Sequence, residues 1–207
     1  MTAKLPAPVT LTGRHVRLEP LGRHHLPELW ASIGQDPDVW RWIPFAAPTT
    51  EEELGAILDV RLAEVAAGTA VKFAAVDLAS GRAVGITGFY DFHAEDELVE
   101  IGGTWNARSV WRTGLNTESK LMLLTYAFEE LGMGRVFWKT DALNDRSRNA
   151  ILRLGASFEG IHRRDKRRHS GVWRDSAYFS MLREEWPGAR ARLEERLAAG
   201  PVGINTP

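Results

Sequence analysis

The segment from Glu100 to Gly155 constrains the fold more than any other part of the sequence. It begins with a strand ending near Trp105, and residues 116–131 then place apolar side chains at helical spacing. The run RVFWKTDA reads as a second strand and NDRSRNAILRLG as a second helix. Strands joined by a crossover helix pair in parallel or lie near each other in one sheet, so both helices should begin at one sheet edge. We therefore expect the loops NARSVWRTGLN and DALNDRS to face one crevice.

Antiparallel strands and further helices surround this unit. Residues 70–105 read as three antiparallel strands, because few residues separate the runs, and their glycines indicate bulges. We also expect two short strands around Gly13, helices over 23–32 and from Thr50 to Gly68, an irregular loop over 34–48, and a hairpin turning at 169–171. The predicted fold class is α/β, of the α+β type. It has a mixed, mainly antiparallel central sheet with one parallel pair of strands, flanked by helices.

Composition limits the function classes. The chain has 207 residues, 44% hydrophobic and 26% charged, with a formal net charge of -1, as in an ordinary globular domain. With 0 cysteines it has no disulfide, no thiolate zinc site and no cysteine nucleophile. The first residues lack the apolar core of a signal peptide, and no apolar run approaches the roughly 20 residues that span a bilayer. We expect a cytoplasmic protein without a membrane partner.

The turn WRTGLN opens directly onto a helix, a place where anions bind readily. Helix N-termini present about four unpaired N–H donors and about half a positive charge, which suit a diphosphate. Gly114 permits close backbone approach, and Arg112 adds a permanent cation. Glu118 opposes this reading, since its carboxylate complements the same helix dipole. The site binds an anion if Glu118 turns aside, and is a plain helix cap if it does not.

The second loop offers a different set of groups. Asn144 is a candidate N-cap whose amide could also meet the amides of an extended ligand. Ser147, one turn inside the helix, carries a hydroxyl that could donate to a reacting atom. The two roles of Asn144 are compatible.

Residues 100–160 resemble the acetyl-CoA-binding half of the GNAT acetyltransferases, in particular the Rim-type protein N-terminal acetyltransferases. The run WRTGLN matches that superfamily's diphosphate loop, with Gly114 as the central glycine. Trp111 replaces the usual Gln or Arg, as is common in the Rim-type branch, and Asn116 replaces a small residue. TDALNDRSRNAILRLGASFEG is similar to the family's Asn-x-x-Ser helix and following turn.

The resemblance implies an enzyme that moves an acetyl group directly from acetyl-CoA to an amine, without a covalent intermediate. It assigns the coenzyme to the following residues: Thr104, Trp105, Trp111, Arg112, Thr113, Gly114, Leu115, Asn116, Thr117, Asn144 and Ser147. Backbone N–H groups near Thr104 and Trp105 would hold the thioester carbonyl and pantetheine. Ser147 takes the place where other members carry a tyrosine acid, and would donate a proton to the sulfur.

The general base is less clearly marked. We choose Glu100, on the strand that approaches the acetyl group, with Asp91, His93 and Asp175 as alternatives. Positioning alone could also drive the reaction. We expect no metal, because the histidines lack H-E-x-x-H spacing and the cysteines that would complete a deaminase-type site are absent.

The acceptor is the open question. One GNAT-like domain over 1–207 would bind coenzyme through about 100–160 and the acceptor through about 20–68 and 158–182, with a C-terminal helix at about 183–199. We expect a protein or peptide N-terminus. The alternatives are an aminoglycoside or polyamine type of small amine, and a non-catalytic module that binds acetyl-CoA. The basic run from Arg163 to His169 reads as a solvated turn rather than a nucleic-acid site, and a homodimer is compatible with the sequence.

Overall fold

The computed structural model describes residues 2–200. These residues form one eight-stranded sheet in the order β1-β2-β3-β4-β5-β6-β8-β7. The strands are β1 (Leu11–Thr12), β2 (Val16–Pro20), β3 (Ala70–Asp77), β4 (Arg82–His93), β5 (Leu98–Asn106), β6 (Arg135–Asp141), β7 (Ser157–Arg167) and β8 (Trp173–Leu182). Neighbouring strands are antiparallel except β5 and β6, which are parallel. The predicted fold class is confirmed.

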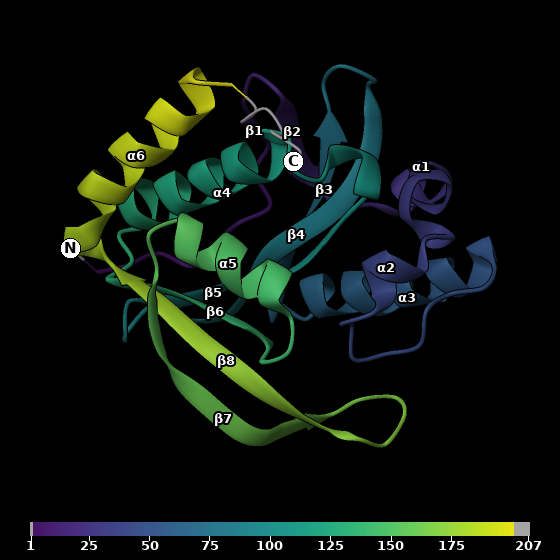
Figure 1. The fold of residues 1–207 in the computed structure, drawn as a ribbon. Helices are drawn as coiled ribbons and strands as arrows, with labels where there is room; N and C mark the ends of the chain where they lie inside the picture. The colour runs from purple at the N-terminus through teal and green to yellow at the C-terminus, as the bar shows by residue number, and fades with distance from the viewer. Residues whose placement is uncertain (1, 201–207) are drawn as a thin grey trace, which may run out of the picture.

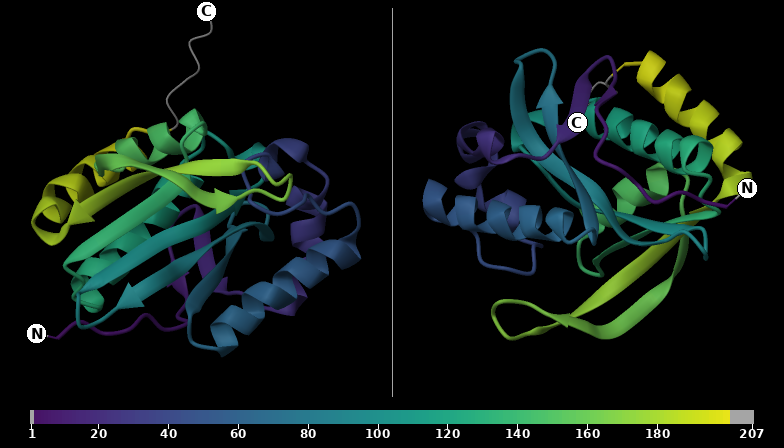
Figure 2. Two further views of the ribbon diagram at one scale, coloured as in Figure 1. Left: turned by 90° about the horizontal axis from the view of Figure 1, so that it is seen from below. Right: turned by 180° about the vertical axis from the view of Figure 1, so that it is seen from behind.

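Helices lie on both sides of the sheet. They are α1 (Leu26–Leu29), α2 (Pro37–Trp40), α3 (Glu51–Ala66), α4 (Leu115–Thr125), α5 (Asp145–Arg153) and α6 (Trp186–Ala198). Short 3-10 turns η1 (Arg23–His25), η3 (Arg108–Val110) and η5 (Arg183–Glu185), and π turns η2 (Trp30–Gly34) and η4 (Tyr126–Glu130), extend or join them. Helices α4, α5 and α6 gather on one side of the molecule and α1, α2 and α3 on the other (Figure 1, Figure 2).

Helix α2 lies in the segment that the sequence predicted to be irregular, so that prediction is wrong at this point. Pro37 occupies its first turn, where its missing N–H costs nothing, and the Asp36 side chain accepts a hydrogen bond from the backbone N–H of Asp38. The prolines and turn formers that argue against a long helix therefore start this single turn.

The parallel strands β5 and β6 pair only over their first residues. Their register ends where Glu100 meets Phe137, although β5 continues to Asn106 and β6 to Asp141. Beyond that point the backbone groups that the two strands direct toward each other have no ladder partner. Helices α4 and α5 follow these strands, so both begin at the edge where the strands separate (Figure 1). The prediction that both helices begin at one edge of the sheet is confirmed.

A bulge distorts β5 beside this opening. Ile86 pairs with Trp105 and Gly88 with Gly102, so Thr87 alone stands opposite two residues of β5. The extra residue, Gly103, has a φ of 59°. A Cβ there would clash with the Tyr90 hydroxyl, so this position requires glycine. The bulge predicted from the glycines is confirmed.

The core fills both faces of the sheet. Trp40, Trp105, Trp138 and Trp186 are all buried, which fits the general tendency of tryptophan to pack. Within the described residues, no helix combines the length and the apolar composition that crossing a membrane requires.

Candidate active site

The amino end of α4 is open. Its N-cap residue, Gly114, supplies no side-chain cap, and only the N–H of Leu115 is hydrogen-bonded to the preceding turn, at 3.2 Å from the Thr113 hydroxyl. Gly114 has an ordinary helical φ of -66°, whereas Arg112 takes the left-handed φ of 62°. The strained residue of the loop is therefore Arg112, whereas a Cβ at Gly114 would meet only the side chains of His15 and Leu197, each at 3.4 Å.

Glu118 turns away from this helix end. Its carboxylate accepts hydrogen bonds from the backbone N–H groups of Arg14 and His15, both at 2.7 Å, and of Val16 at 3.0 Å. The side chain is buried in the turn between β1 and β2. Of the two alternatives left by the sequence, the geometry favours an anion site over a plain cap.

The two loops at the open edge contact each other. The Arg146 guanidinium of α5 lies 3.6 Å from the centroid of the Trp111 ring, a cation–π contact. Trp111 also donates from Nε1 to the Asn106 carbonyl at 2.8 Å, and the Asn116 amide oxygen accepts from the Asn106 amide at 3.2 Å. The residue that departs from the family pattern, Asn116, is thus tied to the end of β5.

Three arginines from separate elements influence one another, and one of them, Arg112, lies in the loop just before α4. Burial lowers the pKa of Arg153, on α5, and the positive charges of Arg196, on α6, and Arg112 lower it further. Clustered like charges attract an anion. Sequence reasoning identified Arg112 but missed Arg153 and Arg196, because nothing in their local sequence marks them as neighbours.

Asn144 acts as the cap of α5. Its side-chain oxygen accepts the backbone N–H of Ser147 at 3.1 Å, and the side chain is buried. The expected capping role is confirmed. Ser147 is half-buried in the first turn of α5, at the edge where β5 and β6 separate.

The side chains of Thr104 and Trp105 are both engaged within the protein. The Trp105 ring packs in the acceptor-side core, with ring centroids 5.2 Å from Trp40 and 5.5 Å from Phe45. The Thr104 hydroxyl lies 2.7 Å from Lys120 Nζ. Both side chains are therefore engaged, and the backbone is what these residues can offer a ligand.

Glu100 stands apart from the other candidate bases because it is buried. Its carboxylate lies 2.8 Å from Lys139 Nζ, and Asp91 lies 3.5 Å from the same amine. Burial raises the pKa of Glu100, although Lys139 opposes this. Asp91, His93 and Asp175 are exposed, and the carboxylate of Asp175 accepts the backbone N–H of Arg164 on the outer hairpin.

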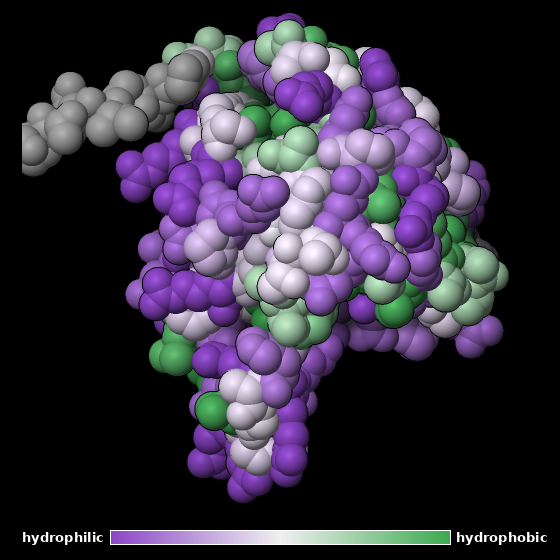
Figure 3. Space-filling model, turned by 90° about the vertical axis from the view of Figure 1, so that its right-hand side faces the viewer, coloured by the Kyte–Doolittle hydropathy of each residue, from purple (hydrophilic) through white to green (hydrophobic). Residues whose placement is uncertain are grey.

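The two expected acceptor rims meet. The backbone N–H of His169, at the tip of the β7–β8 hairpin, donates to the Pro44 carbonyl at 2.9 Å. Arg168 forms an ion pair with the buried Asp141 at the end of β6 and lies 5.8 Å from the Trp42 ring centroid. The hairpin extends from the body as an arm with a mainly hydrophilic surface (Figure 1, Figure 3).

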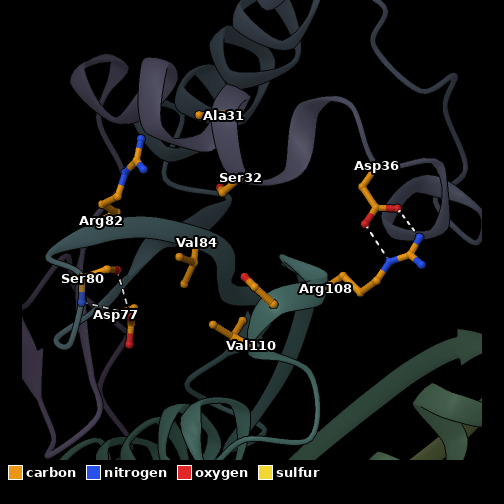
Figure 4. A pocket seen from close by; sticks show the side chains of 10 residues that line it. Ala31, Ser32, Asp36, Asp77, Ser80, Arg82, Val84, Arg108 and Val110 are labelled. Atoms are coloured by element: carbon orange, nitrogen blue, oxygen red, sulfur yellow. Dashed lines mark hydrogen bonds and ion pairs between the residues drawn. The ribbon is translucent and has the colours of Figure 1, made fainter.

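A separate hollow lies beside η3, lined by residues of η2 and of the β3–β4 turn (Figure 4). On its wall Arg108 donates to both carboxylate oxygens of Asp36, at 2.9 and 2.8 Å, and pairs with Asp38 at 2.6 Å. This guanidinium is fully engaged, so it does not add to the arginines at the α4 end.

One group of side chains in the described part of the chain has the composition of a metal site: Glu19, His24 and His25. His25 Nδ1 lies 3.1 Å from the backbone nitrogen of Gly22 and 3.2 Å from its carbonyl oxygen, and Nε2 lies 3.5 Å from the Glu19 carboxylate. Glu19 is also paired with Arg17. Two of the three side chains in the group, Glu19 and His25, therefore already have protein partners.

Comparisons with known proteins agree with this geometry. The model of the acetyltransferase (GNAT) domain matches residues 15–157. A Bacillus subtilis protein with the provisional name ribosomal N-acetyltransferase YdaF is 33% identical over 113 residues, which cover 55% of this chain and 61%, less than two thirds, of that protein. A GCN5-related N-acetyltransferase from Brucella melitensis has a TM-score of 0.87 at 30% identity, over 94% of this chain and 87% of that one. Mycobacterium smegmatis RimJ in complex with CoA-disulfide, at 23% identity, has a TM-score of 0.74 over 90% of each chain and shares the fold. The chain belongs to the GNAT acetyltransferases, a family of acyltransferases that use acetyl-CoA.

Proposed function

We propose that this chain transfers an acetyl group from acetyl-CoA to the primary amine of a protein or peptide N-terminus. The observation that carries the proposal is the open amino end of α4 beside the separated strands β5 and β6. An extended thioester can lie along the unpaired backbone of β5 while its diphosphate meets the helix amides.

The residues present fit the coenzyme. Glu118 is turned away from the anion site, and Arg112, Arg153 and Arg196 add positive charge near it. The coenzyme supplies the activated acetyl group. The protein's part is to orient it, which the backbone of β5 and the start of α4 accomplish without a covalent intermediate.

Two side chains would move protons. Glu100, kept partly basic by burial, takes a proton from the amine as the new C–N bond forms. Ser147 relays a proton to the sulfur as the C–S bond breaks: its hydroxyl donates to the departing thiolate and takes a proton from solvent water, so the departing group leaves as a thiol. Asn144 holds the backbone of Ser147 and thereby its hydroxyl.

The acceptor side supports a peptide over a cationic small molecule. A site for polyamines or aminoglycosides needs acidic walls. The hairpin rim here carries Arg163, Arg164 and Arg167, and Trp42 forms part of the opposite rim. The relative YdaF is named for ribosomal acetylation, which also points to a protein acceptor.

The test is a thiol-release assay with acetyl-CoA against panels of N-terminal peptides and small amines, together with thermal shifts in CoA and in NAD. We expect CoA and acetyl-CoA to raise Tm, NAD to leave it unchanged, and peptides to give the higher kcat/KM. Higher kcat/KM for polyamines or aminoglycosides would transfer the assignment to small molecules. Coenzyme binding without turnover on any panel would identify a binding module.

A further inference from the structure

Lys120 is a buried amine for which the proposed chemistry has no use. It lies in the second turn of α4, and only 5% of its surface is exposed. Its Nζ lies 2.8 Å from the Thr87 hydroxyl and 2.7 Å from the Thr104 hydroxyl. Burying an amine that is charged in water is costly, so a role at this place would explain its presence.

The two threonines stand on either side of the β-bulge. Thr87 of β4 is the residue that faces both Gly103 and Thr104 of β5, and the two hydroxyls are 3.0 Å apart. Lys120 therefore joins α4 to both strands where β5 departs from regular pairing. The same part of β5 has already separated from β6.

Within residues 2–200, no carboxylate pairs with the amine. Glu118, on the same helix, is hydrogen-bonded to the turn between β1 and β2. Glu100 and Lys72 lie on the other face of the sheet, where Lys72 pairs with Glu64 of α3. The elements packed on α4 turn buried apolar side chains inward: Val16 and Leu18 from β2, and Ala189 and Leu193 from α6. Burial alone lowers the pKa of Lys120 to about 7.

We propose that Lys120 is a positioning residue for acyl transfer that couples the coenzyme-binding end of α4 to the bulge of β5. The inference rests on the proposed function, because it concerns the residues between the diphosphate site and the thioester site. With the amine in place, the backbone near Thr104 is held at a fixed position relative to the helix end. Its removal leaves the two sites able to shift against each other.

The proposed role of Lys120 predicts that coenzyme affinity depends on pH. Lys120 lies one turn after the start of α4, so its protonated amine favours binding of an anionic ligand there. Coenzyme binding in turn favours the protonated form of Lys120. Affinity is then greatest below pH 7 and falls as the pH rises through the titration of the amine in the complex. A side chain that only filled space would not give this dependence.

The test uses Lys120→Met in the full chain. This change keeps the volume of the side chain, and the Thr87 and Thr104 hydroxyls keep each other as partners. We measure CoA affinity by calorimetry from pH 6 to pH 8, with kcat, KM and Tm. Titration of the ligand's own phosphate is common to both proteins and cancels in the ratio of their affinities.

We expect the variant to bind CoA about five-fold more weakly at pH 6, with the difference shrinking toward pH 8. Its kcat should fall about ten-fold, and its Tm at pH 7 should equal or exceed that of the parent, because an amine costly to bury is gone. Ser119→Ala is the matched control. Its hydroxyl is buried on the same helix and bonds only the Leu115 carbonyl in its own turn, so affinity and kcat should not change.

Equal affinity at every pH and equal kcat in the parent and Lys120→Met would overturn the inference. The inference would also be overturned if Lys120→Met had a lower Tm but kept the pH dependence of CoA affinity seen in the parent. The role of Lys120 would then be structural. If Lys120→Met does not fold, Thr104→Val removes one of the two contacts and should lower kcat in the same direction; unchanged kcat there refutes the proposal. A parent protein that binds no CoA would instead refute the proposed function.

Discussion

The two sides of the site are built in different ways. On the coenzyme side, the groups that would meet a ligand are mainly backbone: the open end of α4 and the unpaired edge of β5. On the acceptor side, side chains of the 36–49 segment and of the β7–β8 hairpin form the rims. Backbone groups are fixed by topology, whereas side chains vary freely. This explains why the sequence indicates the coenzyme but does not indicate the acceptor.

Glu100 is the proposed base between the coenzyme side and the acceptor side, and Glu100→Gln should have the largest effect on the rate. A general base contributes about 10² to 10⁴ in rate, so kcat should fall by that factor while binding of CoA and acceptor persists. Burial raises the pKa of Glu100. The activity of the parent should therefore decline as the pH falls through this pKa and the base becomes protonated. The variant should not show this decline. Steady-state kinetics across pH measure both.

Asp91→Asn is the matched control, because Asp91 also lies near Lys139 but is exposed. It should retain kcat within about two-fold, as surface changes away from the reacting atoms usually do. A large loss in Asp91→Asn with none in Glu100→Gln would move the base to Asp91.

Ser147→Ala probes the coenzyme side during the reaction. We expect kcat to fall about 10²-fold, the lower range for proton transfer, with CoA affinity nearly unchanged. The affinity should survive because the Asn144 cap binds the backbone N–H of Ser147, which alanine retains. Pre-steady-state turnover and calorimetry separate the two quantities, and turnover equal to that of the parent removes Ser147 from the mechanism.

Arg153→Gln tests the charge at the coenzyme side in the ground state. We expect CoA affinity to fall about five-fold at low salt, with a smaller loss at high salt, because the interaction is electrostatic. Arg190→Gln is the control, since Arg190 is paired with Glu129 and Glu194. An equal loss in both variants would show a general effect of net charge and no local cluster.

Trp42→Ala should have the smallest effect, confined to the acceptor side. We expect KM for a peptide acceptor to rise about three-fold through lost apolar contact, while CoA affinity is unchanged. Leu5→Ala, at an exposed position outside both sides of the site, should leave both unchanged. A change of CoA affinity in Trp42→Ala would contradict the division of the site into two sides.

Local patterns predicted the framework of the fold. Thr50 caps α3 and Asn144 caps α5, as their spacing indicated. The glycines of β4 and β5 do mark a bulge at Gly103, and the crossover helix does join parallel strands. These features depend on neighbours in the chain, which a sequence displays directly.

Contacts between distant segments could not be predicted. Lys120 lies on an apolar helix face, and only the fold shows that two threonines of the sheet satisfy its amine. Arg196 and Arg112 both influence the pKa of Arg153, although the three residues lie on different elements, so no local sequence pattern marks them as neighbours. The direction of Glu118 was left as two alternatives, and a turn about a hundred residues earlier in the chain decides it.

A crystal structure of the protein with bound CoA tests the central claim most directly. The account predicts the diphosphate at the start of α4, with oxygens about 2.7–3.2 Å from backbone N–H groups of residues 114–117, and the pantetheine along β5 beyond Glu100. A diphosphate bound elsewhere, or a helix end occupied by a protein side chain in the complex, would contradict it.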